Sequence, residues 1–442
     1  MESIQNRRRR DRWFVVLVAL AFWTWLGKDL IFSVIHVELP TGRLITIVVV
    51  VLILLFVAGR PKITPGERLI REFRLKSLIA VMFFLCYCAL HVLIDGSAWS
   101  LFKLESLTIG IIVAYALSYK TIRAIKMHKN LFFIVGFLFG LAAYYAVFSE
   151  IKSVMEMAPT KGLRSLGVAT LNVQDYYIVL FLYATALLFG GSFRCLYLLM
   201  FVGTATLCVP IVIGLSSRMV PFTVGVTIMY MIVVLQSVLS TRKNILRNIL
   251  ILSIIAIGGM MFIGDHMHSE LRIFQVFTDG PLQLFVQGPR YISFAAALRN
   301  FWESPLYGIG FGNFVYPGEF VDRGVRLAGM WPHNIFLELL SELGLIGFFL
   351  FVYATGRTFL KVLLARFKSS QEFIVLPCLL LIYTVVSMQL THNLVYPFLW
   401  VGYFCCDAAF HYNKYAFPIP GETHNATSGT FVEEGKTAQC ER

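Results

Sequence analysis

Residues 331–355 read WPHNIFLELLSELGLIGFFLFVYAT, a polar entry followed by a mostly apolar run. A run of roughly 18 or more apolar residues is long enough to cross the hydrocarbon core of a membrane as a helix. Similar runs recur along the chain, and 58% of its 442 residues are hydrophobic while only 14% are charged. A soluble protein of this size could not cover so much apolar surface with polar groups. The sequence therefore predicts an all-α polytopic membrane protein.

About twelve transmembrane helices are expected, and the charges between them set the orientation. Lys and Arg gather in alternate connections, such as residues 60–76 and 120–130, and the positive-inside preference places these connections and both chain ends in the cytoplasm. The net charge of +13 therefore does not indicate a nucleic-acid partner, because it is spread over short connections between spans. The expected spans lie near residues 13–27, 44–59, 77–94, 105–119, 130–149, 173–190, 195–215, 219–239, 248–264, 334–355, 372–390 and 394–410.

The longest connection, residues 265–333, falls on the outer face in this topology. Within it, SFAAALRNFWESPL carries apolar residues at helical spacing, which predicts short amphipathic helices at the membrane surface. Long ordered loops are more often functional than filler. We expect residues 1–411 to form the membrane domain and the polar residues 412–442 to form a disordered cytoplasmic tail.

His333 is the first candidate for chemistry, because it ends the outer connection at the point where a predicted helix begins. The dipole of a helix N-terminus disfavours a protonated imidazole, and a neutral imidazole is what a general base requires. Taken alone, His333 has a simpler interpretation as an interfacial histidine hydrogen-bonded to water. The arginines on the same face favour the catalytic interpretation.

Three arginines on the outer face are candidates for binding an anion. Arg218 lies in the short turn GLSSRMVPF between two apolar helices, where an arginine is costly unless it is paired or functional. The alternative is that Arg218 extends to the lipid headgroups. Arg290 leads into the amphipathic run, and Arg164 lies in GLRSLG. Guanidinium groups stay charged and bind phosphate oxygens in bidentate fashion, so with His333 these residues predict a site for a phosphate-bearing substrate.

The run YGIGFGNF places Gly308, Gly310 and Gly312 at alternate positions. It lacks the spacing and the flanking strands of a dinucleotide fingerprint. The glycines indicate instead a loop that needs open backbone angles. No cluster of metal-ligating residues is evident in the sequence, so we expect neither a metal nor another cofactor.

At these residues the chain resembles the O-antigen ligase and polymerase superfamily of bacterial envelope proteins. HNIFLELLSELGLIG matches the ligase pattern of His, Asn, nine residues, Gly, two residues and Gly, with His333, Asn334, Gly344 and Gly347 at the four positions. RYISFAAALRNFWESPLYGIGFGNF is similar to the arginine-led helix and glycine loop of the family, and SSRMVP is similar to its short Ser-Arg turn. The resemblance covers roughly residues 160–390, and the spacing of the histidine motif favours a ligase over a polymerase.

The resemblance implies a glycosyltransferase with a GT-C-like helical membrane fold in the bacterial inner membrane, with its site facing the periplasm. The donor would be a polysaccharide on undecaprenyl diphosphate and the acceptor the lipid A-core oligosaccharide, joined by inversion at the anomeric carbon without a metal. His333 would be the general base, and Arg218 and Arg290 would hold the diphosphate. Arg164 is a weaker match, because its surroundings are less motif-like.

Two alternatives stay open at this point. An O-antigen polymerase would use a second lipid-linked glycan as the acceptor. A transporter of lipid-linked sugars would carry ionisable groups or broken helices near the middle of the membrane. Asp175 and Asp407 lie near predicted span ends and do not form a proton relay, whereas the candidate charges gather at the outer face. This distribution favours chemistry at the membrane surface.

Overall fold

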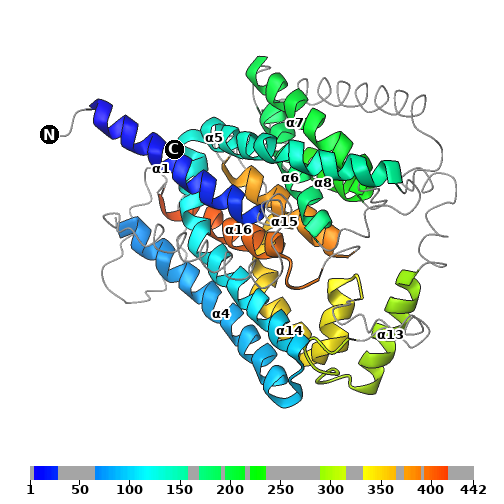
Figure 1. The fold of residues 1–442 in the computed structure, drawn as a ribbon. Coiled ribbons are helices and arrows are strands. Elements are labelled where there is room, and N and C mark those ends of the chain that lie inside the picture. The colour runs from blue at the N-terminus through cyan, green and yellow to red at the C-terminus, as the bar shows by residue number, and fades with distance from the viewer. Residues whose placement is uncertain are drawn as a thin grey trace, which may run out of the picture.

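The computed structural model describes residues 4–27, 65–157, 169–190, 195–214, 220–234, 289–314, 332–364, 373–389 and 393–416. The secondary structure of these residues is helical, without a strand, as the predicted all-α class requires (Figure 1). The helices are α1 (Ile4–Leu26), α4 (Pro65–Asp95), α5 (Ala98–Met157), α6 (Ala169–Gly190), α7 (Cys195–Gly214), α8 (Val220–Val234), α13 (Pro289–Glu303), α14 (Ile335–Leu364), α15 (Val375–Met388) and α16 (Pro397–Ala416).

Three of the described helices are long and apolar enough to cross a membrane, over Arg68–Ile94, Ala98–Tyr144 and Ile335–Leu364. Shorter apolar stretches occupy Val173–Leu188, Cys195–Cys208 and Val375–Met388. These helices support the membrane character of the chain, while the number of twelve spans stays a prediction. The spans expected near residues 44–59 and 248–264 lie outside the described residues.

Helix α5 joins two regions that the sequence analysis placed in separate spans. It runs from Ala98 to Met157 and leaves helical geometry at His128, where φ is −151° and ψ is 73°. The part before His128 runs beside α4, and the part after it turns across the molecule toward α6 and α7 (Figure 1). The basic connection at residues 120–130 is therefore helical on both sides of a bend.

Aromatic side chains fill the space between α1, α5 and α6. The indole Nε1 of Trp23 donates a hydrogen bond to the carbonyl oxygen of Phe132 (3.0 Å). The hydroxyl of Tyr176 donates to the carbonyl oxygen of Gly136 (2.6 Å), and the indole of Trp23 occupies the space that a Cβ on Gly136 would need. The hydrogen bonds of Trp23 and Tyr176 offset the cost of burying their polar atoms in this core.

At the other end of the molecule, α13 lies beside the first part of α14 and occupies the segment in which a surface helix was predicted (Figure 1). Ala296 and Ala297 of α13 pack with Phe314 against Leu337 of α14. The two helices begin at the same end, so the start of α13 and the residues before α14 face the same side of the molecule. The last helix, α16, continues to Ala416, past the predicted domain end at 411, and residues 417–442 lie outside the described residues.

Helix α14 breaks at Gly344, whose φ of 63° and ψ of −166° are accessible to glycine and strained for other residues. The glycine loop, residues 304–314 after α13, packs into the break. A Cβ on Gly344 would clash with the carbonyl of Leu306, and a Cβ on Gly308 would clash with the carbonyl of Glu342. Backbone hydrogen bonds join the loop to the break: Ile309 N to Ser341 O (2.9 Å), Gly310 N to Glu342 O (3.0 Å), Leu345 N to Pro305 O (2.9 Å) and Ile346 N to Leu306 O (3.2 Å). The backbone groups that the break releases are thus paired again, as an apolar environment demands.

The break predicts a sharp difference between two Gly→Ala substitutions. Gly344→Ala should lower the thermal stability of the purified protein, because its combination of φ and ψ is accessible almost only to glycine and costs another residue about 1–3 kcal/mol even before the clash with Leu306. Gly110→Ala in α5 is the matched control, since nothing lies within 4 Å of its added Cβ. The control should leave the melting temperature unchanged or raise it, because alanine is the better helix former. Equal melting temperatures for both variants would contradict the described break.

Candidate functional site

His333 sits in a strained backbone conformation directly before α14. Its φ is 56°, and it is the one described non-glycine residue with a positive φ. Pro332 before it is buried, and the imidazole itself is partly buried. Glycine adopts this conformation without a steric cost, and asparagine, aspartate and histidine are the other residues enriched in it, so a positive φ does not select histidine in particular. The backbone alone therefore does not account for a histidine at this position.

The other three residues of the histidine motif have structural roles. Asn334 caps α14, because its Oδ1 accepts hydrogen bonds from the backbone N–H groups of Phe336 (3.0 Å) and Leu337 (3.1 Å). Gly344 provides the break. Gly347 leaves room for the ring of Tyr87 in α4, whose hydroxyl donates to the carbonyl oxygen of Leu343 (3.2 Å). His333 is the one motif residue with a titratable side chain, so it is the member of the motif that could take part in proton transfer.

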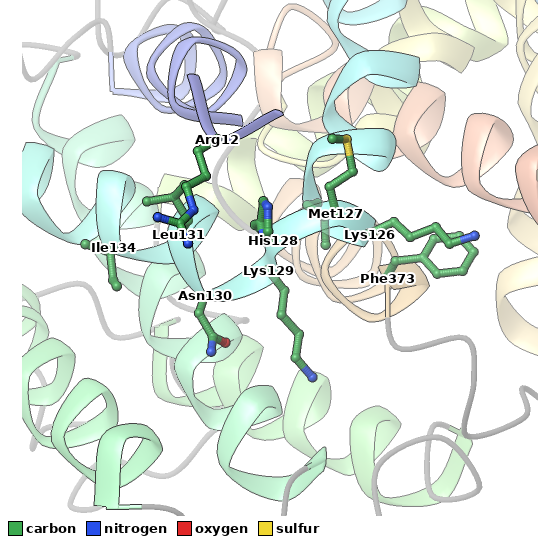
Figure 2. A pocket seen from close by; sticks show the side chains of 10 residues that line it. Arg12, Lys126, Met127, His128, Lys129, Asn130, Leu131, Ile134 and Phe373 are labelled. Atoms are coloured by element: carbon green, nitrogen blue, oxygen red, sulfur yellow. The ribbon is translucent and has the colours of Figure 1, made fainter. Parts of the chain in front are cut away.

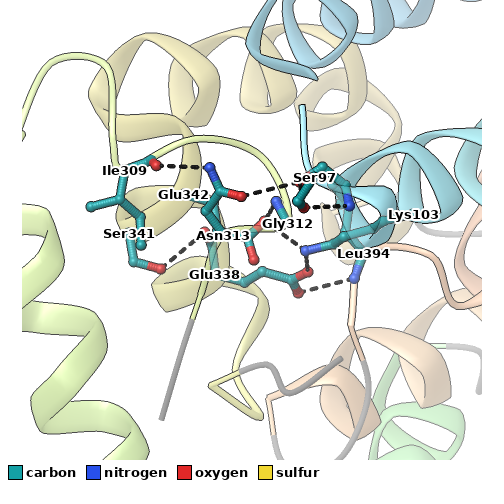
Figure 3. Close-up of polar contacts among 10 residues, drawn as sticks. Ser97, Lys103, Ile309, Gly312, Asn313, Glu338, Ser341, Glu342 and Leu394 are labelled. Atoms are coloured by element: carbon teal, nitrogen blue, oxygen red, sulfur yellow. Dashed lines mark hydrogen bonds and ion pairs between the residues drawn. The ribbon is translucent and has the colours of Figure 1, made fainter. Parts of the chain in front are cut away.

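A buried ion cluster lies below the N-terminal end of α14 (Figure 3). The ammonium Nζ of Lys103, from α5, is 2.6 Å from Oε1 of Glu338 and 2.6 Å from Oε2 of Glu342. The side chain of Lys103 is only 2% exposed, and both carboxylates are similarly buried. Glu338 and Glu342 are four residues apart, so they lie on one face of α14, the face that also carries Asn334.

Two backbone N–H groups complete the cluster. Leu394 N donates to Oε2 of Glu338 (3.0 Å), and Gly312 N donates to Oε2 of Glu342 (2.8 Å). The second bond requires the close approach of the glycine loop, since a Cβ on Gly312 would come within 2.9 Å of the backbone of Ser100 in α5. The cluster thus connects α5, α14, the glycine loop and the segment before α16.

The engagement of Lys103 limits what it can do chemically. Its charge is shared between two carboxylates and its side chain is buried, so it is not placed to grip a substrate phosphate. Buried ions are tolerated only when partners compensate the loss of water. We therefore assign Lys103, Glu338 and Glu342 a role in positioning the first turns of α14, the helix that His333 precedes.

A second buried polar cluster supports the same region. Asp175 of α6 accepts hydrogen bonds from the hydroxyls of Tyr383 in α15 and Tyr396 just before α16 (2.5 Å for Tyr396). Tyr396 lies two residues from Leu394, which contacts Glu338. Asp175, set aside in the sequence analysis as no proton relay, is thus a structural anchor for the segment that closes the ion cluster.

The structure places only part of the predicted anion site. Arg290 is the second residue of α13, which puts its backbone in the first turn of that helix. Its side chain, together with Arg218 and Arg164, lies outside what the structure describes. The assignment of these arginines to a diphosphate stays a prediction.

The sequence analysis missed Lys103, Glu338 and Glu342 although a signal was present. Ionisable residues inside apolar helices are rare and expensive. Glu338 and Glu342 stand four residues apart within the predicted span 334–355, and Lys103 stands just before the predicted span 105–119. Opposite charges in two such helices at the same membrane face are candidates for a buried pair.

No protein-family model matches this chain, and no curated protein matches it.

The ion cluster predicts a specific pattern of destabilisation. Lys103→Met should lower the melting temperature strongly, because breaking a buried pair from one side typically costs about 3–5 kcal/mol. Adding Glu338→Gln and Glu342→Gln to Lys103→Met should recover part of that loss, since no uncompensated buried charge remains. Thermal unfolding of the detergent-purified variants measures both effects. A Lys103→Met protein as stable as the wild type would show that the cluster is not formed.

Proposed function

We propose that the protein is an O-antigen ligase of the bacterial inner membrane, transferring a polysaccharide from undecaprenyl diphosphate to the lipid A-core oligosaccharide at the periplasmic face. The observation that carries the proposal is His333, a histidine at positive φ directly before α14, whose first turns are held by the buried ion cluster. The likeness of the surrounding residues to the ligase motif supplies the substrate class.

In the proposed reaction, His333 removes the proton from an acceptor hydroxyl as that oxygen attacks the anomeric carbon of the donor. The bond between this carbon and the diphosphate oxygen breaks, and the diphosphate leaves with the bonding electrons. Arg218 and Arg290 would stabilise the charge that develops on the leaving group, which preorganised cations do effectively in a site that excludes water. One displacement inverts the configuration at the anomeric carbon.

The rigidity of the support matters for this chemistry. A general base must lie within hydrogen-bond reach of the proton it takes, and small displacements weaken it. The N-terminal part of α14 is short, but it is tied by the ion cluster to α5 and by backbone hydrogen bonds to the glycine loop. This arrangement favours a fixed position for the residues that enter α14.

The reaction is tested with purified protein, a purified lipid-linked donor and one acceptor at a time. Lipid A-core should receive the glycan, while a second lipid-linked glycan should not. Elongation of the second lipid-linked glycan would identify a polymerase instead. Movement of donor across a vesicle membrane without any glycosidic product would identify a transporter.

Two substitutions at His333 separate catalysis from structure in this assay. His333→Asn keeps a residue that tolerates positive φ, so the melting temperature should stay near that of the wild type. Transfer per folded molecule should nevertheless fall by about 10²–10⁴-fold, the usual contribution of a general base. His333→Ala should lose transfer similarly and also some stability. If the His333→Asn variant transferred glycan at the wild-type rate, His333 would not be the general base.

The arginines are tested by changes that keep the charge. Arg290→Lys and Arg218→Lys should each weaken donor binding and transfer, because a lysine cannot hold a diphosphate in bidentate fashion. Arg299→Lys is the matched control in the same helix as Arg290, since the side chain of Arg299 is 80% exposed and pairs with Glu303. Donor binding that stays normal in the first two variants, as in the control, would mean that these arginines do not hold the donor.

A further inference from the structure

A basic pocket lies at the bend in α5, and Lys103 lies near the other end of the part of α5 before the bend. It has a volume of about 850 Å³ and is lined by residues of α1, the bend and the start of the α15 region (Figure 2). Lys103 and Lys126 are separated along a continuous helix by about 35 Å at the usual rise per residue. This is close to the roughly 30 Å thickness of a bilayer core, so the pocket and the candidate site belong to opposite membrane faces.

The position of the pocket is fixed by its neighbours at that end of the bundle. Arg74 of α4 donates hydrogen bonds to the carbonyl oxygen of Tyr115 and to Oγ of Ser118 in α5. The ring of Tyr119 lies 6.0 Å from that of Tyr412 in α16, centroid to centroid. The first turns of α4 and the last turns of α16 therefore meet α5 near the pocket, at the face that the basic connections assign to the cytoplasm.

The chemistry of the lining is cationic with an apolar base. Arg12, Lys126 and Lys129 contribute positive charges and His128 an imidazole, while none of the lining residues is acidic. Lys126 lies over the ring of Tyr412 at 4.9 Å and over that of Phe373 at 5.7 Å. These contacts hold the lysine by cation–π attraction, which leaves its positive charge in place. Apolar lining residues complete the pocket: Ile125, Met127, Leu131, Ile134 and Phe373.

The geometry decides between kinds of anionic ligand. Figure 2 shows Arg12 reaching in from α1 while Lys126 and Lys129 leave the bend of α5 in different directions, so the three side chains do not converge on one point. A small anion is best held by converging donors, whereas spread charges beside an apolar wall suit a phosphate headgroup attached to acyl chains. Basic pockets between membrane helices at the cytoplasmic face bind anionic lipids through this combination.

We propose that this pocket binds the phosphate headgroup of an anionic phospholipid in the cytoplasmic leaflet. Arg12 of α1 and Lys129 of α5 both line the pocket, so a bound lipid would contact both helices. The proposal is independent of glycan transfer, because it uses none of the residues at the other membrane face.

The proposal is tested by thermal unfolding of the full-length protein in a neutral detergent. Added phosphatidylglycerol should raise the melting temperature of the wild type, and phosphatidylcholine should not. The Arg12→Gln, Lys129→Gln double variant should need about 25-fold more phosphatidylglycerol for the same shift, roughly fivefold for each charge near a membrane surface. Arg12 is exposed, and the melting temperature without lipid reports whether the variant has folded.

The matched control removes two charges from the same end of the molecule outside the pocket. Arg71 and Lys76 are exposed on α4, so the Arg71→Gln, Lys76→Gln double variant should respond to phosphatidylglycerol as the wild type does. If both double variants lost the same part of their response to phosphatidylglycerol, the lipid would be attracted by the general surface charge and not by the pocket. Stabilisation of the wild type by inorganic phosphate at the same ionic strength, as large as that by the lipid, would make this a site for free anions and overturn the lipid assignment.

Discussion

The ion cluster of Lys103, Glu338 and Glu342 is the constraint on which the arrangement around the start of α14 depends. Removing a charged side chain from water costs several kcal/mol, even after a protein relaxes around it. The cost is offset here by two contacts of 2.6 Å to one ammonium group and by two backbone N–H donors. None of the four segments involved can move away without leaving a buried charge uncompensated.

This constraint explains why a broken helix can serve as a rigid element. The part of α14 before Gly344 is short, and a short helix is marginal by itself. It is stabilised by the cap from Asn334, by the backbone hydrogen bonds of the glycine loop and by the two carboxylates that reach Lys103. Functional groups are most effective when the elements that carry them are held in this way. The strained backbone of His333 persists because the surrounding structure determines it.

Sequence patterns predicted the class of the protein and several of its elements, because these depend on local composition. The apolar runs predicted membrane-capable helices, and helical spacing predicted α13. The continuity of α5 was missed because its basic connection was read as a loop, although Lys, Arg, Ala and Met are good helix formers. A charged segment at the end of a span is compatible with either structure.

The contacts that build the site were harder to predict, because they join residues far apart in the chain. Gly308 and Gly344 were each recognisable as glycines in a motif, but their mutual close approach depends on how α13 and α14 pack. The pairing of Lys103 with Glu342 spans 239 positions. The glutamates at helical spacing were visible in advance, and only the fold could identify their partner.

We propose that His333 acts as a base in a single displacement at the anomeric carbon, rather than as a nucleophile. The anomeric configuration of the transferred linkage tests this most directly. Nuclear magnetic resonance of the donor and of the isolated glycan product reports the configuration of the same carbon before and after transfer. The account predicts the opposite configuration in the product. A retained configuration would require two successive displacements through a covalent intermediate, and it would contradict the role given to His333.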